Sequence, residues 1–372
     1  MRDLRTRAEP IPNLGLGRDD FDRDYTAILY SHAFRRLRHK TQVFFYPESD
    51  HVCTRLDHSL YVAAISDLVC KNLRSRGIDC NPTLARAIGI GHDLGHAPFG
   101  HAGQEILNRL AKDIDGFAHE RHGLRIVEKI DKPRAQGPVI GLNLTLAVRD
   151  GIVNHYGEDP STSISPADSP KLDGRSYPCT VEGCIVRLVD KIAYLGRDLE
   201  DAVDATLLKE SDVPGEIAAI IGTRNGEIVD YFVGDIIDNS DADRISLSET
   251  ASKLMGKMTK FNQEVIYGHK IIESYKQKTR HILDTLFDWL MERVHEFEDR
   301  VDLYMQDKSL RLMCVFGKFI GDRSILYFEE EPKTLSRKGD LHKRIVIDFM
   351  STLTDNFVFQ SCSELFLPKS II

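Results

Sequence analysis

Residues 91–101 combine metal-binding side chains with residues that end a helix. The stretch reads Gly-His-Asp-Leu-Gly-His-Ala-Pro-Phe-Gly-His, so the adjacent His92 and Asp93 are followed by two more histidines within nine positions. Imidazole and carboxylate groups together suit divalent ions from Mg²⁺ and Mn²⁺ to Fe, Co, Ni and Zn. A helical pattern that Pro82 opens delivers His92 and Asp93 at its C-terminal end, where Gly95 allows both side chains to reach one ion. The stretch therefore predicts a metal site at the end of a helix.

A His-Asp pair by itself does not specify a metal site, so further ligands must come from elsewhere in the chain. His58 and Asp190 are the candidates, because each lies in a segment with helical apolar spacing. Together with His92 and Asp93 they would offer two imidazoles and two carboxylates to one ion.

Apolar residues recur at three- and four-residue steps through most of the chain, which predicts helices. The expected helices include residues 18–40, 57–75 and 345–366. In the second of these, Leu60, Ala64 and Leu68 form an apolar stripe. Residues 157–183 are rich in Pro, Ser, Asp and Gly and read as a long connection. No Gly-rich phosphate loop and no alternation of strands with helices occurs, so the expected fold class is all-α.

The overall charge and the cysteines restrict the class of protein. A net charge of −8 over 372 residues argues against binding nucleic acid through overall charge, so any bound anion must be met by local Arg and Lys. The seven cysteines are scattered, as expected for reduced thiols. The N-terminus carries no signal-peptide pattern, and no apolar run reaches membrane-spanning length. We therefore expect a soluble, cytoplasmic protein with no membrane partner.

Several motifs in a fixed order carry a resemblance to a known family. They span residues 33–37 with 40–44, 54–60, 92–103, 141–145, and 190–194 with 198–202, with weaker echoes at 261–269 and 348–366. In these motifs the chain resembles the bacterial deoxyguanosinetriphosphate triphosphohydrolases, or dGTPases, of the HD superfamily of metal-dependent phosphohydrolases. The resemblance covers nearly the whole chain and implies an all-α HD-domain helical fold with additional C-terminal helices.

The resemblance also implies a domain organisation and a set of partners. The expected parts are an N-terminal arm over 1–17, an HD core over 18–205 and a mainly helical C-terminal region over 206–372 packed on that core. Relatives assemble as tetramers or hexamers, and in some of them deoxynucleotides bind as activators. A homo-oligomer is therefore implied, with a dNTP effector and single-stranded DNA as further candidate partners.

The resemblance implies a hydrolytic reaction at one metal ion. His58, His92, Asp93 and Asp190 would hold one divalent ion per subunit, either Mg or Mn or another transition metal such as Fe, Ni, Co or Zn. Such an ion lowers the pKa of a bound water. Attack of this water at the α-phosphorus of a dNTP such as dGTP would then yield a deoxynucleoside and inorganic triphosphate.

Two histidines and a set of substrate contacts are assigned by the same resemblance. His101 matches the histidine close to the leaving 5′ oxygen, and His119 matches a second active-site histidine. The matching substrate contacts are Arg55, His96 and Lys191 for the triphosphate, Tyr194 and Asp198 for the deoxyribose, and Gln42 near its 3′-hydroxyl.

One position departs from the family pattern. Many relatives place an acidic residue three positions after the equivalent of His101, where it can orient the imidazole and favour its protonated form. This chain has Gln104 there, with Glu105 next to it. We expect His101 to be a weaker proton donor here, unless Glu105 or Glu120 substitutes. On this hypothesis Gln104→Glu raises turnover or shifts its pH optimum upward.

Two other functions remain open from the sequence. The first is an HD-family phosphohydrolase acting on another nucleotide, such as a nucleoside monophosphate, a cyclic dinucleotide or an alarmone. The second is a nucleotide-sensing or nucleic-acid-binding protein with a structural or vestigial metal site, which the basic run of residues 35–40 would suit.

Overall fold

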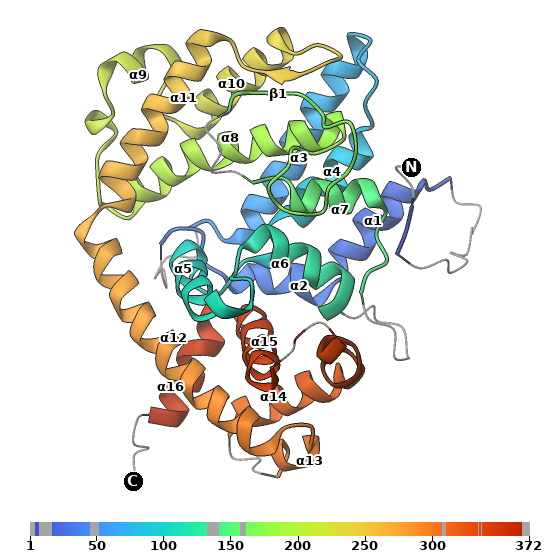
Figure 1. Ribbon diagram of the computed structural model, residues 1–372. Coiled ribbons are helices and arrows are strands. Elements are labelled where there is room, and N and C mark those ends of the chain that lie inside the picture. Colours follow the sequence, from blue (N-terminus) through green and yellow to red (C-terminus); the bar gives the residue numbers. More distant parts are fainter. Residues whose placement is uncertain are drawn as a thin grey trace.

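The computed structural model of the chain describes residues 4–6, 17–44, 52–131, 141–156, 161–306, 310–333, 335 and 337–366. They form a helical fold (Figure 1), which confirms the all-α prediction. The described strands are one short antiparallel pair, β1 (Ser163–Ile164) against β2 (Ile245–Ser246). Most of the expected arm over 1–17 lies outside the described residues, and the domain boundary at residue 205 stays a prediction.

The helices up to residue 204 form the part of the fold that contains the metal-site motifs. In chain order they are α1 (Asp20–Leu29), α2 (His32–Arg36), η1 (Leu37–His39), α3 (Arg55–Ser75), α4 (Pro82–Gly91), η2 (His92–Gly95), α5 (Gly100–Leu110), η3 (Lys112–Ile114), α6 (His119–Arg125), η4 (Ile126–Ile130), α7 (Leu146–Val153) and α8 (Val181–Asp204). Helix α4 packs against α1, α3, α7 and α8, so the segment that ends in the His-Asp pair lies at the centre of this group.

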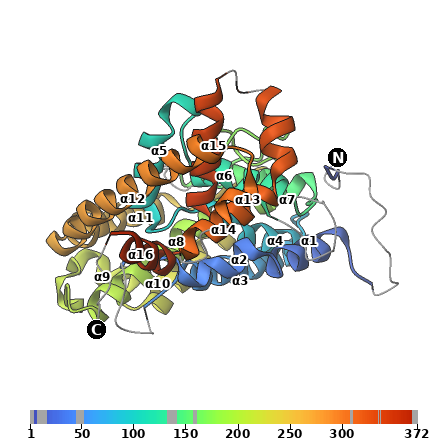
Figure 2. The same ribbon diagram turned by 90° about the horizontal axis from the view of Figure 1, so that it is seen from below.

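The helices after residue 204 extend the fold in two directions. They are η5 (Glu210–Asp212), α9 (Gly215–Ile221), α10 (Asn225–Asn239), α11 (Glu249–Phe261), η6 (Asn262–Tyr267), α12 (Lys270–Phe297), α13 (Val301–Tyr304), α14 (Arg311–Gly321), η7 (Leu326–Glu330), η8 (Glu331–Lys333), α15 (Lys338–Ser351) and α16 (Asp355–Phe366). The long helix α12 contacts α5 and α15 and leads to the group α13–α16 (Figures 1 and 2).

The expected single helix over residues 18–40 is wrong. The chain leaves α1 after Leu29 and starts α2 at His32, because Ser31 caps the new helix: its hydroxyl accepts a hydrogen bond from the Phe34 N–H at 3.0 Å. Asp131 then fixes the start of α2, since its carboxylate accepts the Ala33 N–H at 2.9 Å.

The apolar stripe expected on α3 lies on the exposed side of that helix. Leu60 and Leu68 are 41% and 50% exposed. The buried side instead carries small residues, because α4 approaches very closely. A Cβ on Gly89 of α4 would lie 2.7 Å from the Ala63 Cα, so this contact excludes larger side chains.

The expected last helix over 345–366 is two helices, α15 and α16, which separate after Ser351. Asp355, the first residue of α16, accepts backbone hydrogen bonds from Thr41 at 2.9 Å and from Phe99 at 2.8 Å. Lys40 is buried and donates to the Ser351 carbonyl at 2.7 Å. The C-terminal helices thereby hold the segments on either side of the metal motif in place.

Candidate active site

His92 and Asp93 lie where α4 changes into the tight turn η2, which confirms their predicted place at a helix end. The side chain of Asn81 caps the start of α4. His92 Nδ1 lies 2.7 Å from the Gly89 carbonyl oxygen. A carbonyl can only accept, so Nδ1 carries a proton and Nε2 of the neutral ring keeps its lone pair for a ligand.

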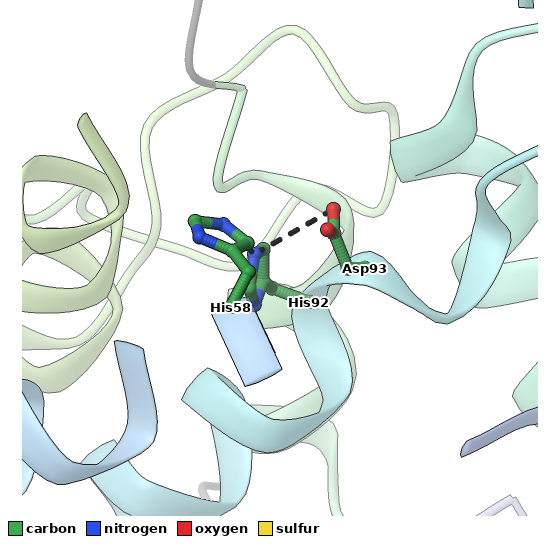
Figure 3. Close-up of side chains that lie close together, drawn as sticks. All are labelled: His58, His92 and Asp93. Carbon is green, nitrogen blue, oxygen red and sulfur yellow. Dashed lines mark hydrogen bonds and ion pairs between the residues drawn. The ribbon is translucent and has the colours of Figure 1, made fainter. Parts of the chain in front are cut away.

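The structure brings the four predicted metal ligands together. Donor atoms of His58, His92 and Asp93 all lie within 4.8 Å of one another (Figure 3). Asp190 joins through the two imidazoles, since its Oδ1 lies 2.8 Å from His58 Nε2 and 3.5 Å from His92 Nε2. The two Nε2 atoms are 3.3 Å apart. Metal bonds of about 2.0–2.2 Å place neighbouring donors on one ion about 3 Å apart, so this set fits a divalent cation.

The charges at this cluster are balanced inside the protein. Burial would raise the pKa of the Asp93 carboxyl, but His96, Arg55 and His92 hold that pKa well below its usual range. Burial would lower the pKa of His92, but the carboxylates of Asp93 and Asp190 raise the pKa to about 9. Two buried carboxylates beside two imidazoles therefore form a site that a bound cation would neutralise.

Arg55 connects the metal cluster to the adjoining cavity. Its Nη1 donates to Asp93 Oδ2 at 2.7 Å, and the side chain is buried. Its Nε and Nη2 have no hydrogen-bond acceptor among the described residues. Gly100 makes room for this guanidinium, because a Cβ there would lie 3.1 Å from Nη2. Two unused donors of a buried guanidinium suit the oxygens of a phosphate.

A cavity of about 780 Å³ opens beside the cluster. It is lined by every predicted site residue except His92: Gln42, Arg55, His58, Asp93, His96, His101, His119, Asp190, Lys191, Tyr194 and Asp198. Residues of α11, η6 and α12 also line it. The volume lies within the range of about 300–1,000 Å³ that small-molecule sites occupy.

Three of the predicted substrate residues lie on the α8 face of the cavity. Lys191 donates to the Ser161 carbonyl at 3.1 Å, and Tyr194 is half-buried. Asp198 is buried and accepts a hydrogen bond from the Tyr267 hydroxyl at 2.5 Å. Burial raises the pKa of Asp198 to about 7, despite that hydrogen bond. Gln42 also lines the cavity, and its buried side-chain oxygen has no hydrogen-bond partner among the described residues.

Tyr267 is a cavity residue that the sequence did not single out. It ends η6, and its hydroxyl donates a hydrogen bond to Asp198, which also lines the cavity. In the sequence, only the weak resemblance of residues 261–269 to the family pointed to this segment.

The predicted role of Gln104 beside His101 is wrong. Its side-chain oxygen accepts hydrogen bonds from His119, at 2.9 Å from the backbone N–H and 2.7 Å from Nδ1. Residue 104 therefore orients the second histidine rather than the first. Of the proposed substitutes, Glu120 also lies beside His119, with Oε2 3.5 Å from Nδ1, and the exposed Glu105 lines the cavity.

His101 and His119 both reach the cavity with different environments. The ring of His101 lies 5.3 Å from the ring of His96 and is exposed to the cavity. His119 is buried and stacks on His96 with 3.9 Å between ring centroids. Its Nε2 lies 3.1 Å from Nε2 of His155, a buried histidine that no sequence motif marked.

Comparisons with known proteins show what the chain is similar to. Residues 55–195 match the family model of the HD domain. A deoxyguanosinetriphosphate triphosphohydrolase-like protein of Caldanaerobacter subterraneus subsp. tengcongensis is 35% identical over 95% of this chain and 86% of the relative. Proteins of the same description from Clostridium perfringens (strain 13 / Type A) and Desulfatibacillum aliphaticivorans are 33% and 31% identical. They match over 94% and 95% of this chain and 87% and 90% of their own lengths.

No helix in the described parts of the chain combines the length and the apolarity that crossing a membrane requires.

Proposed function

Because the chain belongs to the deoxyguanosinetriphosphate triphosphohydrolase-like family of HD-domain phosphohydrolases, we propose that it hydrolyses deoxynucleoside triphosphates to a deoxynucleoside and inorganic triphosphate. One observation carries this proposal. The His58, His92, Asp93 and Asp190 cluster opens into the same cavity as Arg55, whose guanidinium has two buried donors without acceptors. Hydrolysis of a phosphate ester needs a cation that activates water and a positive group that binds the phosphate oxygens, and this cavity has residues suited to both.

The four ligands hold the ion in our proposal, and Mg, Mn or another transition metal such as Fe, Ni, Co or Zn would suit them. A divalent ion there supplies Lewis-acid polarisation and a more acidic water. Arg55 remains fixed by Asp93 while its other nitrogens bind triphosphate oxygens. Lys191 and His96 also line the cavity and would add to that contact.

The leaving 5′ oxygen needs a proton when its bond to the α-phosphorus breaks. We assign this proton to His101, because its ring is exposed to the cavity and meets the ring of His96 edge-on rather than face to face. His119 is less suited, since its proton is on Nδ1 and is used in the hydrogen bond to Gln104. The oxygen of water ends on the triphosphate.

The far end of the cavity would receive the sugar. Tyr194 offers a ring face, and Asp198 offers a carboxyl that already accepts from Tyr267. Gln42 presents an acceptor that a sugar hydroxyl would satisfy. These three residues would favour a deoxyribose over a bare phosphate compound.

Product analysis tests the proposal. The purified chain is incubated with Mn²⁺ and each dNTP in turn, and the products are separated by ion exchange. Inorganic triphosphate with the deoxynucleoside supports it, whereas pyrophosphate or single phosphate contradicts it and favours another phosphohydrolase activity.

We also propose a cytoplasmic homo-oligomer, tetramer or hexamer, for this protein. The exposed apolar side chains of Leu60, Tyr61 and Leu68 on α3 support an association surface. A dNTP effector and single-stranded DNA stay candidate partners. Light scattering of the purified chain, alone and with dNTP, tests the assembly.

A further inference from the structure

Asn262 is a buried cavity residue that has no part in the reaction proposed above. It begins η6 and lines the cavity together with Tyr267, which ends that segment. The side chain is fully buried, and its Oδ1 has no hydrogen-bond donor among the described residues. Burying such an oxygen costs about 1–3 kcal/mol. A leucine of similar size would avoid this cost, so the amide group itself needs an explanation.

The amide of Asn262 is attached to helix α8. Its Nδ2 donates to the Leu195 carbonyl oxygen at 3.0 Å. A carbonyl oxygen only accepts, so this contact fixes which end of the amide is the nitrogen. Leu195 follows Tyr194 directly and precedes Asp198 by three positions. Asn262 is therefore tied to the stretch of α8 that carries both residues assigned to the sugar.

The π-helical turn η6 brings Asn262 and Tyr267 to the same side of the segment. In an α-helix, residues five positions apart point about 140° away from each other, because each residue turns the chain by about 100°. The hydrogen bonds of a π-helix span five residues, so its turn is wider and residues five apart come closer to one line. Both ends of η6 can therefore face the cavity.

The hydroxyl of Tyr267 has neighbours on both sides. It donates to the Asp198 carboxylate at 2.5 Å. Burial and Asp198 raise the pKa of Tyr267 well above its usual value, whereas a hydrogen bond from the Asn262 side chain opposes this rise. A hydrogen bond lowers the pKa of a phenol when it is donated to the phenol oxygen. The two N–H bonds of Asn262 Nδ2 thus serve Leu195 and Tyr267, which leaves Oδ1 without a donor.

We propose that Asn262 is a positioning residue that sets how strongly the cavity selects a 3′-hydroxyl on the sugar. Asn262 donates to the Tyr267 oxygen, so the Tyr267 proton points to Oδ2 of Asp198. Oδ1 of Asp198 then accepts the hydrogen bond of the 3′-hydroxyl. Asn262 acts from behind these two side chains and touches no substrate atom. The inference rests on the proposed function, which supplies the deoxyribose.

A substrate that lacks only the 3′-hydroxyl measures this selection. A site built to hydrogen-bond a hydroxyl discriminates against the analogue without it, because buried polar groups are then left unpaired. The pair to compare is dGTP and 2′,3′-dideoxyguanosine triphosphate, with Mn²⁺. We expect the wild-type protein to have a kcat/KM for dGTP at least about 10-fold above that for the dideoxy compound.

Asn262→Ala should lower this ratio at least about 3-fold, because kcat/KM falls for dGTP but hardly changes for the dideoxy compound. Asn225→Ala is the matched control and should keep the wild-type ratio. The Oδ1 of Asn225 is also buried without a partner among the described residues, and it packs on α8 at Gly196, but Asn225 is not among the cavity-lining residues. An equal loss with both substrates in Asn262→Ala would indicate a merely structural role and overturn the proposal.

Tyr267→Phe tests whether Asn262 acts through the Tyr267 hydroxyl. It should lower the ratio by about the same factor as Asn262→Ala, and the double variant should lower it no further. Independent losses that multiply in the double variant would overturn the proposal. Asn262→Leu, which keeps the size of the side chain, replaces Asn262→Ala if the latter does not fold.

Nucleoside binding separates this inference from the proposed function, because it needs no turnover. 2′-Deoxyguanosine and 2′,3′-dideoxyguanosine are titrated into the Mn²⁺-loaded protein in a calorimeter. Tighter binding of deoxyguanosine that Asn262→Ala abolishes, without release of triphosphate from dGTP, would support the role of Asn262 and refute the dNTP reaction. Release of triphosphate with the same selectivity in wild type and Asn262→Ala would refute the role of Asn262 and support the reaction.

Discussion

Gln104 holds His119 in one orientation and one tautomer, since its side-chain oxygen lies 2.9 Å from the backbone nitrogen and 2.7 Å from Nδ1 of His119. His119 lines the cavity, whereas Gln104 is not among the lining residues. Gln104 is thus the residue through which the orientation of His119 can be tested without touching the cavity lining.

Gln104→Met should reduce turnover by about 10-fold or more, because the one oxygen that accepts both hydrogen bonds of His119 disappears while the size of the side chain is retained. Gln104→Glu keeps an acceptor for both bonds, so its turnover should stay closer to that of the wild type. Steady-state kinetics of both variants measure this. Equal turnover of wild type and Gln104→Met would show that His119 needs no such support.

Arg55→Lys should lower kcat/KM by about 10-fold or more, equivalent to about 1.4 kcal/mol. Lysine keeps the charge but lacks the fork that binds Asp93 and a phosphate at once. Arg76→Lys is the control, because Arg76 is exposed and pairs with Asp238 at the surface. A wild-type kcat/KM in Arg55→Lys would exclude a forked phosphate contact.

Asp198→Asn should stabilise the protein without substrate, and more so at higher pH. The unfolded carboxyl ionises near 3.8, but burial raises the pKa in the folded protein to about 7. Between these values the unfolded chain has lost a proton that the folded chain retains, so ionisation of Asp198 destabilises the fold as the pH rises. Asn carries no such charge and can still accept from Tyr267.

The difference in unfolding free energy between Asp198→Asn and wild type should therefore grow by about 1.4 kcal/mol per pH unit between about pH 4 and 7, and level off above. Urea unfolding at pH 5, 6, 7 and 8 measures it. The groups around Asp198 are Tyr267, Asp201, Arg55 and Arg197, and all are unchanged in the variant. A difference that does not depend on pH would show that Asp198 titrates normally.

Gly95→Ala should destabilise the protein by more than about 2 kcal/mol, because the added Cβ would lie 1.9 Å from the His119 carbonyl oxygen and force η2 away from α6. Gly234→Ala is the opposite case: it lies exposed inside α10 with open space around it, and should stabilise by about 0.5–1 kcal/mol. Urea unfolding compares the two. A mild effect of Gly95→Ala would mean that this contact is loose.

The sequence marked the four residues of the cluster through separate motifs, and only His92 and Asp93 are neighbours in the chain. His58 and Asp190 lie 132 positions apart and meet only in the fold, so their assignment as metal ligands stays a prediction. The sequence did not predict which histidine Gln104 contacts. Gln104 follows His101 by three positions in α5, which suggested a contact between these two, but its side chain instead accepts hydrogen bonds from His119 at the start of α6. His155 carried no motif, because its partner His119 lies 36 positions earlier and meets it only through the packing of α6 on α7.

The boundaries of the helices were predicted less well where a cap or a close contact decides them. Ser31 starts a new helix inside a continuous apolar pattern. The stripe at Leu60 and Leu68 faces outward, because small residues are needed where α3 meets Gly89 of α4. The spacing of apolar residues along the sequence shows which side chains are hydrophobic, but it does not show how closely two helices approach each other.

Hydrolysis of a dNTP in water enriched in oxygen-18 tests the central claim, attack of water at the α-phosphorus, most directly. The products are separated after a single turnover with Mn²⁺, and each is analysed by mass spectrometry. We predict that the label enters the inorganic triphosphate and that the deoxynucleoside carries none. Label in the 5′-hydroxyl of the deoxynucleoside, or in a released phosphate or pyrophosphate, would contradict the account.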